Sequence, residues 1–166
     1  MNIVEEFKKV RDIPYRIPLS IEEPDECCTG KTDMLFRIFK KGGYDVRYRL
    51  CTFRWSDLNL PKEIQGIPHD DESSHTYLEI RIDGEWRIID ATWDRKLKGI
   101  FNINEWDGKS DAEIAVPTRE CLSPEKSLGY IKHTSTPEAI TADLKVNGEF
   151  YKAFNEWLET KRGESK

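Results

Sequence analysis

The sequence lacks any long apolar segment. No run of hydrophobic residues approaches the roughly 20 that a membrane-spanning helix needs. Residues 1–10 mix acidic side chains into their apolar positions and so lack the hydrophobic region of a signal peptide. No Asn-x-Ser/Thr glycosylation acceptor occurs in the chain. We therefore expect a cytoplasmic protein that makes no contact with a membrane.

The sequence has fewer basic than acidic residues. The 26 Lys and Arg residues are outnumbered by 31 Asp and Glu residues, which gives a formal net charge of −5. Such a chain is a poor electrostatic match for phosphate backbones, so we expect no nucleic acid partner. Aromatic residues, in contrast, make up 11 % of the 166 positions, which is too many for a disordered chain. At this length we expect residues 1–166 to fold as a single domain.

Cysteine is scarce as well. The cysteines stand at positions 27, 28, 51 and 121. Without a secretory signal, a disulfide framework is not expected. The vicinal Cys27 and Cys28 lack the C-x-x-C spacing that lets two sulfurs bind one zinc ion. A metal site built from His69, Asp70 and His75 is the weaker alternative, and we expect no metal and no cofactor.

Hydrophobic periodicity separates the expected helices from the expected strands. The pattern predicts helices over 2–11, 29–41 and 149–161, and strands over 44–54, 75–82 and 85–92. Residues 56–74 are polar and interrupted by prolines, so we expect a long loop that acts as a mobile lid or rim over a cleft. Residues 94–148 are rich in turn signals and carry no assignment. This order of elements predicts an α+β domain with an antiparallel sheet.

A tight turn determines which residues of the expected hairpin face each other. Asp83-Gly84 is a typical two-residue hairpin turn. It places Tyr77 opposite Asp90, so His75 lies one diagonal step from Asp90 on the same face. Diagonal neighbours have Cα atoms about 7–8 Å apart, within reach of an imidazole and a carboxylate. The pairing predicts a dyad in which Asp90 orients His75, and the alternative is that both are ordinary residues of a solvated face.

A cysteine stands at the start of the second expected helix. Cys28 immediately precedes helix 29–41, whose free N–H groups and dipole stabilise a thiolate. Lys31, one turn later, is expected to add a cation on about the same side. A helical step of about 100° per residue directs Cys28 toward the sheet that carries His75, whereas Cys27 projects to a flank. A thiolate with an oriented histidine base is the arrangement that performs covalent acyl chemistry.

Four segments between residues 26 and 93 carry a family resemblance. They are CTGKTDMLFRIFKKGGYDVR (28–47), His75-Thr-Tyr-Leu-Glu79, Gly84-Glu-Trp86 and Ile89-Asp-Ala-Thr92. In this order they resemble the nucleophile helix, the His-x-Trp-x-Glu strand, and the Gly-x-Trp and Leu-Asp-Pro-Thr segments of the transglutaminase-like superfamily. Several linked segments are more specific than any single motif.

The resemblance implies both a fold and a chemistry. It implies a papain-like α+β fold of the transglutaminase-core type, in which an N-terminal nucleophile helix packs on an antiparallel sheet. It also implies a catalytic triad of Cys28, His75 and Asp90 that attacks a peptide or protein amide through a thioester. Hydrolysis is favoured over acyl transfer, because cross-linking must keep water from the acyl-enzyme. The alternative is a binding or scaffold protein that keeps the fold without turnover.

The oxyanion hole is the least defined part of the expected site. The backbone N–H of Cys28 supplies one donor, but no Gln or Trp precedes it to supply a second. The Tyr15 hydroxyl is the candidate for that role, and Tyr77 and Trp93 are further candidates for oxyanion or substrate contacts. Nothing in the sequence indicates an oligomeric state.

Overall fold

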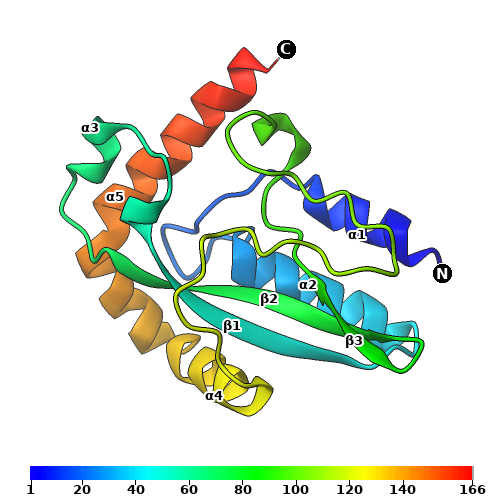
Figure 1. Ribbon diagram of the computed structural model, residues 1–166. Helices are drawn as coiled ribbons and strands as arrows, with labels where there is room; N and C mark the ends of the chain where they lie inside the picture. The colour runs from blue at the N-terminus through cyan, green and yellow to red at the C-terminus, as the bar shows by residue number, and fades with distance from the viewer. Residues whose placement is uncertain (166) are drawn as a thin grey trace.

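A three-stranded antiparallel sheet in the order β1-β2-β3 forms the centre of the computed structural model, which describes residues 1–165 (Figure 1). The chain is therefore of the α+β class. The elements are α1 (Ile3–Arg11), α2 (Cys28–Lys41), β1 (Val46–Arg54), α3 (Lys62–Gln65), β2 (Glu72–Ile82), β3 (Glu85–Ile89), α4 (Pro124–Thr134) and α5 (Pro137–Glu164), with short 3-10 turns at Trp55–Asp57 and Arg95–Leu97.

The β2–β3 hairpin has the predicted register. Asp83 and Gly84 adopt positive φ angles of 51° and 87°, the backbone of a tight turn that matches the twist of the strands. The ladder pairs Ile82 with Glu85 and continues to the pair of Leu78 with Ile89. β3 ends at Ile89 and not at residue 92 as predicted, and the reason is the side chain of Asp90 described below.

Helices α1 and α2 cover one face of the sheet. Successive residues of a strand point to opposite faces, so alternate residues of the strands join this layer. The buried hydrophobic cluster here comprises Phe7, Val10, Leu35, Phe39, Val46, Leu78, Ile80, Ile89, Ala91 and Trp106. The apolar stripe of α2 thus packs on the sheet, as its helical spacing predicted.

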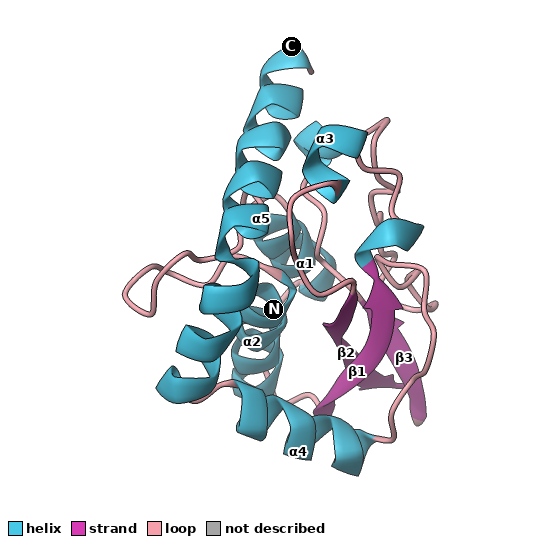
Figure 2. Cartoon of the chain, turned by 90° about the vertical axis from the view of Figure 1, so that its left-hand side faces the viewer, coloured by secondary structure: helices cyan, strands magenta, loops and turns pink. Residues whose placement is uncertain are grey.

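The other face is covered mainly by irregular segments, and α5 packs across the end of the sheet, where Phe150 and Phe154 contact Trp55 just after β1 (Figure 1). Its cluster includes Cys51, Phe53, Trp55, Tyr77, Trp93, Phe150, Phe154 and Leu158. Helix α4 lies along the outer edge of β1 (Figure 2). There the Ser127 hydroxyl accepts the Leu50 N–H at 2.9 Å, and the Leu122 N–H donates to the Leu50 carbonyl at 2.9 Å. The unpaired edge of β1 is therefore capped by side-chain and loop contacts.

The C-terminal third contains more helix than the periodicity predicts. α5 begins at Pro137 and not near residue 149, and α4 was not predicted. The first half of α5 is largely exposed and so carries no apolar stripe. Both helices nevertheless have start signals: Ser123 and Thr136 each precede a proline, and their hydroxyls accept N–H groups at 3.3 Å and 3.2 Å.

The segment 56–74 is not the lid that its polarity suggested. Leu58, Leu60 and Ile64 are buried in the core, and α3 contacts α5. Only the end of the segment, from Asp70 onward, reaches the cavity described below. Its apolar residues are spaced irregularly, so their burial was not visible as a periodic pattern.

The first turn of α2 is pressed against the chain that precedes it. A methyl group added at Gly30 would lie 1.8 Å from the carbonyl oxygen of Asp25. A distance this short to a backbone atom can only be relieved by moving the backbone. The position therefore requires glycine. The close approach of Gly30 to Asp25 fixes the first turn of α2, which positions Cys28.

We predict that Gly30→Ala lowers the free energy of unfolding by about 1–3 kcal/mol, because the added methyl group displaces the backbone around Asp25. Gly148→Ala is the matched control, since that helical position opens to free space. It should raise the free energy of unfolding by up to about 1 kcal/mol through higher helix propensity. Urea titrations of both variants measure the difference, and equal stabilisation by both would contradict the close approach.

Candidate active site

His75 and Asp90 form a buried hydrogen-bonded pair. Nε2–H of His75 donates to Oδ2 of Asp90 at 2.7 Å, and each residue is 2 % exposed. This contact confirms the hydrogen bond predicted from the hairpin register. The strand β2 carries His75, and Asp90 is the first residue after β3.

The carboxylate of Asp90 accepts further hydrogen bonds. Oδ1 accepts the Thr92 N–H at 3.1 Å and the Thr92 hydroxyl at 2.6 Å, and Oδ2 also accepts the Ala115 N–H at 2.8 Å. Burial raises the pKa of Asp90, but the charge and hydrogen bond of His75 and these donors outweigh it and lower the pKa below its usual value. Because the side chain binds its own backbone two residues ahead, the strand leaves the ladder at this point.

The irregular segment after β3 encloses this carboxylate. Nδ2 of Asn104 donates to the Asp90 carbonyl at 2.7 Å, and Asn104 also contacts the Glu113 backbone. Asn104 and Ala115 thus hold the stretch 104–115 against Asp90. This role could not be predicted from the sequence, because any residue type has a backbone N–H like that of Ala115.

Cys28 is the first residue of α2 and lies beside His75. The two side chains border the same small cavity of about 30 Å³. The hydrogen bond made by the Cys28 thiol is to the Thr29 hydroxyl, with Sγ and Oγ1 3.9 Å apart. Burial opposes the imidazolium, but Asp90 and then Cys28 outweigh it and raise the pKa of His75 to about 10. Cys28 is thus paired with a cationic ring.

The two neighbouring thiols differ in protonation. A hydrogen bond from the Cys27 thiol, together with His75, holds the pKa of Cys28 well below its ordinary value despite burial. The same contact and burial raise the pKa of Cys27. The directions of these two pKa shifts favour Cys28 over Cys27 as the ionised thiol, and the assignment of Cys28 as the nucleophile stays a prediction.

Asp25 caps this helix start and was not identified from the sequence. Its Oδ1 accepts the Cys27 N–H at 3.0 Å. Burial raises the pKa of the Asp25 carboxyl, although hydrogen bonds from Cys27 and from the Gly30 N–H act in the opposite direction. An Asp two residues before the N-cap position of a predicted helix is the signal that could have found it.

The Lys31 ammonium does not lie beside Cys28 as expected. Its side chain is 1 % exposed, and its ammonium donates to the carbonyls of Arg11, Ala91 and Thr92 at 2.9, 3.3 and 2.9 Å. Burial lowers the pKa of Lys31 to about 8. Its role is to hold the chain that follows Asp90, so the expectation of a cation beside Cys28 was wrong.

The three aromatic candidates lie in different surroundings. Tyr15 borders the cavity with Cys28, and burial followed by the nearby thiols raises its pKa, so the hydroxyl keeps its proton. The Trp93 ring borders the small cavity, but its indole N–H already donates to the Ala115 carbonyl at 2.8 Å. Tyr77 lines neither of these two cavities, and its hydroxyl lies beside Cys121. Tyr15 alone of the three offers a free hydroxyl near the thiol.

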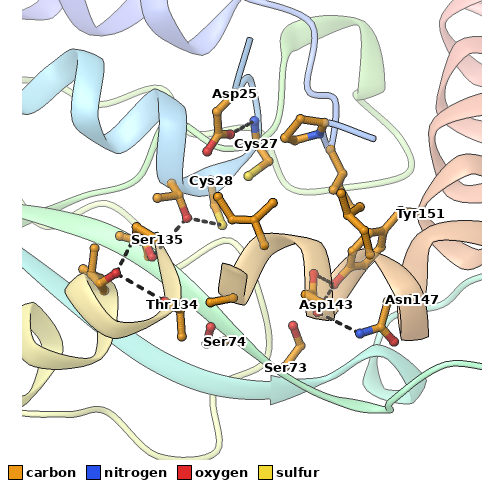
Figure 3. A pocket seen from close by; sticks show the side chains of 18 of the residues that line it. Asp25, Cys27, Cys28, Ser73, Ser74, Thr134, Ser135, Asp143, Asn147 and Tyr151 are labelled. Carbon is orange, nitrogen blue, oxygen red and sulfur yellow. Dashed lines mark hydrogen bonds between the residues drawn. The ribbon is translucent and has the colours of Figure 1, made fainter. Parts of the chain in front are cut away.

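A cavity of about 420 Å³ opens over Cys28 (Figure 3). Its walls come from the start of α2, the start of β2 and the α4–α5 hairpin, with Asp143 and Tyr151 facing Cys27 and Cys28 across the space. The polar part of the lining consists mainly of hydroxyl and carboxylate groups, including Thr29, Ser73, Ser74, Thr134, Ser135 and Asp143. The Cys28 thiol therefore borders a space whose lining is part polar and part apolar.

Two other properties of the described residues bear on the site. Within residues 1–165, no three His, Cys, Asp or Glu side chains come together as metal ligands. His69 instead stacks on Phe150, with ring centroids 3.9 Å apart, and does not join His75. In the same range, no helix is both long enough and apolar enough to cross a membrane.

Comparison of the chain with models of protein families, with curated proteins and with solved structures gives no match. The chemistry of the site must therefore be argued from its own geometry.

We predict that Asp90→Asn makes the alkylation of Cys28 by iodoacetamide strongly pH-dependent. In the native protein the imidazolium of His75, with a pKa of about 10, keeps Cys28 ionised, so the rate should vary little between about pH 6 and 9. Without the Asp90 charge the pKa of His75 falls and that of Cys28 rises, so alkylation at pH 6 should slow by about tenfold or more.

Peptide mapping by mass spectrometry, with fragmentation that distinguishes Cys28 from the adjacent Cys27, measures the Cys28 rate. Asp45→Asn, which changes an exposed residue at the far end of the sheet, is the control and should leave the pH profile unchanged. A flat profile in Asp90→Asn would show that Asp90 does not support the ion pair.

Proposed function

We propose that the protein is a cysteine-dependent amide hydrolase that acts on a peptide or protein through a Cys28 thioester. The observation that carries the proposal is that Cys28 and His75 border one small cavity, while His75 is hydrogen-bonded to a buried Asp90 that accepts further donors. A nucleophile beside a base that an acid orients, with the nucleophile open to a larger cavity, fits acyl chemistry.

In the first half of the reaction, Sγ of Cys28 attacks the amide carbonyl carbon, and negative charge develops on the carbonyl oxygen. The backbone N–H of Cys28 at the start of α2 can donate to that oxygen. As the tetrahedral intermediate collapses, the carbon–nitrogen bond breaks and the imidazolium of His75 gives its proton to the leaving amine. The product is a thioester on Cys28 and a neutral His75.

In the second half, His75 accepts a proton from water while the water oxygen attacks the thioester carbon. The carboxylic acid product leaves, and Cys28 and His75 return to the thiolate–imidazolium pair. The hydroxyl-rich cavity favours water as the acceptor. An amine in place of water would give acyl transfer, which requires that water be excluded.

Tyr15 is suited to be the second oxyanion donor. Its backbone N–H donates to Oδ2 of Asp94 at 3.0 Å, and its carbonyl accepts from Arg162 at 2.8 Å. Arg162 and Asp94 form a buried ion pair at 2.7 Å. A protonated hydroxyl on a chain held at both backbone groups is preorganised, which is what stabilisation of developing charge requires.

The proposal extends to the fold class. A helix that begins with the nucleophile and packs on an antiparallel sheet carrying histidine and aspartate is the arrangement expected of a papain-like, transglutaminase-type core. The segments quoted above support this assignment by resemblance. The competing interpretation is a binding or scaffold protein of the same architecture without turnover.

We predict that Cys28→Ala abolishes thioester formation, because no other thiol is paired with His75, while Cys27→Ala retains most of it. His75→Ala should slow formation by about 10²-fold or more, since both the thiolate and the proton donor are lost. Intact-mass spectrometry after mixing with pools of peptide amides measures the acyl-enzyme. Loss in Cys27→Ala alone would reassign the nucleophile, and no adduct in the native protein with any pool would favour the scaffold interpretation.

A further inference from the structure

The cavity over Cys28 is lined by charge of one sign. Four carboxylate residues border it, namely Asp25, Asp70, Glu72 and Asp143, and none of the lining residues is Lys, Arg or His. Since clefts lined by one sign of charge concentrate ions of the opposite sign, the space should attract cations and repel anions.

The four carboxylates are not equivalent. Glu72 pairs with Arg54 at 2.9 Å, so its charge is largely balanced. Asp25 accepts the Cys27 N–H and belongs to the helix cap. Asp70 and Asp143 remain without a cationic partner among residues 1–165, and both are exposed residues. These two are therefore free to meet a charged ligand.

Asn147 holds Asp70 and Asp143 together. Its Oδ1 accepts the Asp70 N–H at 2.8 Å, and its Nδ2 donates to Oδ1 of Asp143 at 2.8 Å. The Tyr151 hydroxyl also donates to both oxygens of Asp143, at 3.2 and 3.0 Å. Asp143 is thus fixed on the wall opposite the thiols (Figure 3). The Asp143 carboxylate is thus held in place, and the backbone of Asp70 is held beside it, and such an arrangement is better suited to recognition than freely moving surface acids.

A second feature of the same cavity points to a ligand. Tyr15 is 5 % exposed, yet its hydroxyl has no hydrogen-bond partner among the described residues and borders the cavity. The hydroxyl is not one of the fully enclosed polar atoms among the described residues, so it stays accessible from the cavity. It can therefore donate to a polar group of a molecule bound there.

We propose that the substrate carries a positive charge close to the scissile amide, and that this charge docks at Asp70 and Asp143 while the amide carbonyl lies at Cys28 and Tyr15. The chemistry recognised is an ammonium or guanidinium group, as in a peptide with Lys or Arg beside the cleaved bond or with a free amino terminus. This inference rests on the proposed function, since it takes the cavity to be the substrate site.

The charge preference of the cavity can be measured without knowing the substrate. Alkyl methanethiosulfonates transfer their thioalkyl group to a thiolate with release of methanesulfinate, and they exist with trimethylammonium, uncharged and sulfonate head groups. We expect Cys28 to react at least tenfold faster with the cationic than with the anionic reagent at low salt, after each rate is divided by that for 2-mercaptoethanol. Peptide mapping separates Cys28 from Cys51 and Cys121, and fragmentation of the peptide that holds both neighbouring thiols separates it from Cys27.

Two variants of α5 provide the matched comparison. Asp143→Asn keeps the shape of the side chain and removes its charge, so the cation-to-anion ratio should fall by about threefold or more. Glu149→Gln removes the same charge from an exposed position of the same helix that does not line the cavity, and should leave the ratio unchanged. Added salt should reduce the native ratio, because it screens exposed charges.

A panel of peptide amides then tests the substrate itself. Acetylated peptides with Lys or Arg, peptides whose only cation is a free amino terminus, and acetylated neutral or acidic peptides are compared for acyl-enzyme formation. Faster acylation by the first or the second group supports the proposal and identifies the source of the charge. The proposal of a cationic substrate would be overturned if neutral peptides acylated Cys28 as fast as cationic ones and the two charged reagents reacted at equal rates. That result would not contradict the hydrolase function. A charge-selective Cys28 that no amide acylates would instead refute the hydrolase function.

Discussion

The buried carboxylate of Asp90 is the group on which the site depends. It orients His75, binds the backbone and hydroxyl of Thr92, and receives the N–H of Ala115 from a segment more than twenty positions later. A carboxylate with all these donors is far better stabilised than one that has lost any of them. The same contacts end β3 and hold the irregular segment over the His75–Asp90 pair. They also favour the charged form of the imidazole, so one carboxylate determines both the local backbone structure and the electrostatics of the pair.

Helix α5 serves two parts of the site that are distant along its length. Near its middle, Asn147 and Tyr151 hold the acidic wall of the cavity. Further along, the amide of Asn155 binds both backbone groups of Ile17 at 2.9 and 2.8 Å, and Arg162 binds Asp94 and the Tyr15 carbonyl. Because a helix is stiff over this distance, it sets the position of Tyr15 relative to the opposite wall.

The parts of the site that follow from local rules could be predicted from the sequence. The Asp83-Gly84 turn determines the register of the hairpin, and the register brings His75 to Asp90. The end of the α2 pattern at Gly42 and its start at Cys28 follow from helix periodicity and capping. The α+β class and the placement of α2 on the sheet needed nothing beyond these patterns.

The remaining parts depend on contacts between residues far apart in the chain. The Asn104 side chain binds the backbone of Asp90, the Ala115 N–H binds its carboxylate, and Asp94 pairs with Arg162, which lies 68 positions later in the chain. The position of the Lys31 ammonium was predicted wrongly, because helix periodicity gives only the direction in which a side chain leaves the helix. It does not show which backbone carbonyls a long lysine side chain can reach. The cavity walls from α4 and α5 were missed because exposed helices carry no apolar stripe.

The ion pair of His75 and Asp90 also links protonation to the integrity of the fold. The pKa of Asp90 is lowered in the folded chain, so its contribution is complete above the ordinary value of 3.8 and disappears as pH falls through the folded value. The pKa of His75 is raised from 6.5 to about 10, so its contribution is complete below 6.5 and disappears as pH rises through about 10. Both acid and alkaline pH therefore remove the charged pair, and with it one of the contacts that hold the irregular segment after β3 in place.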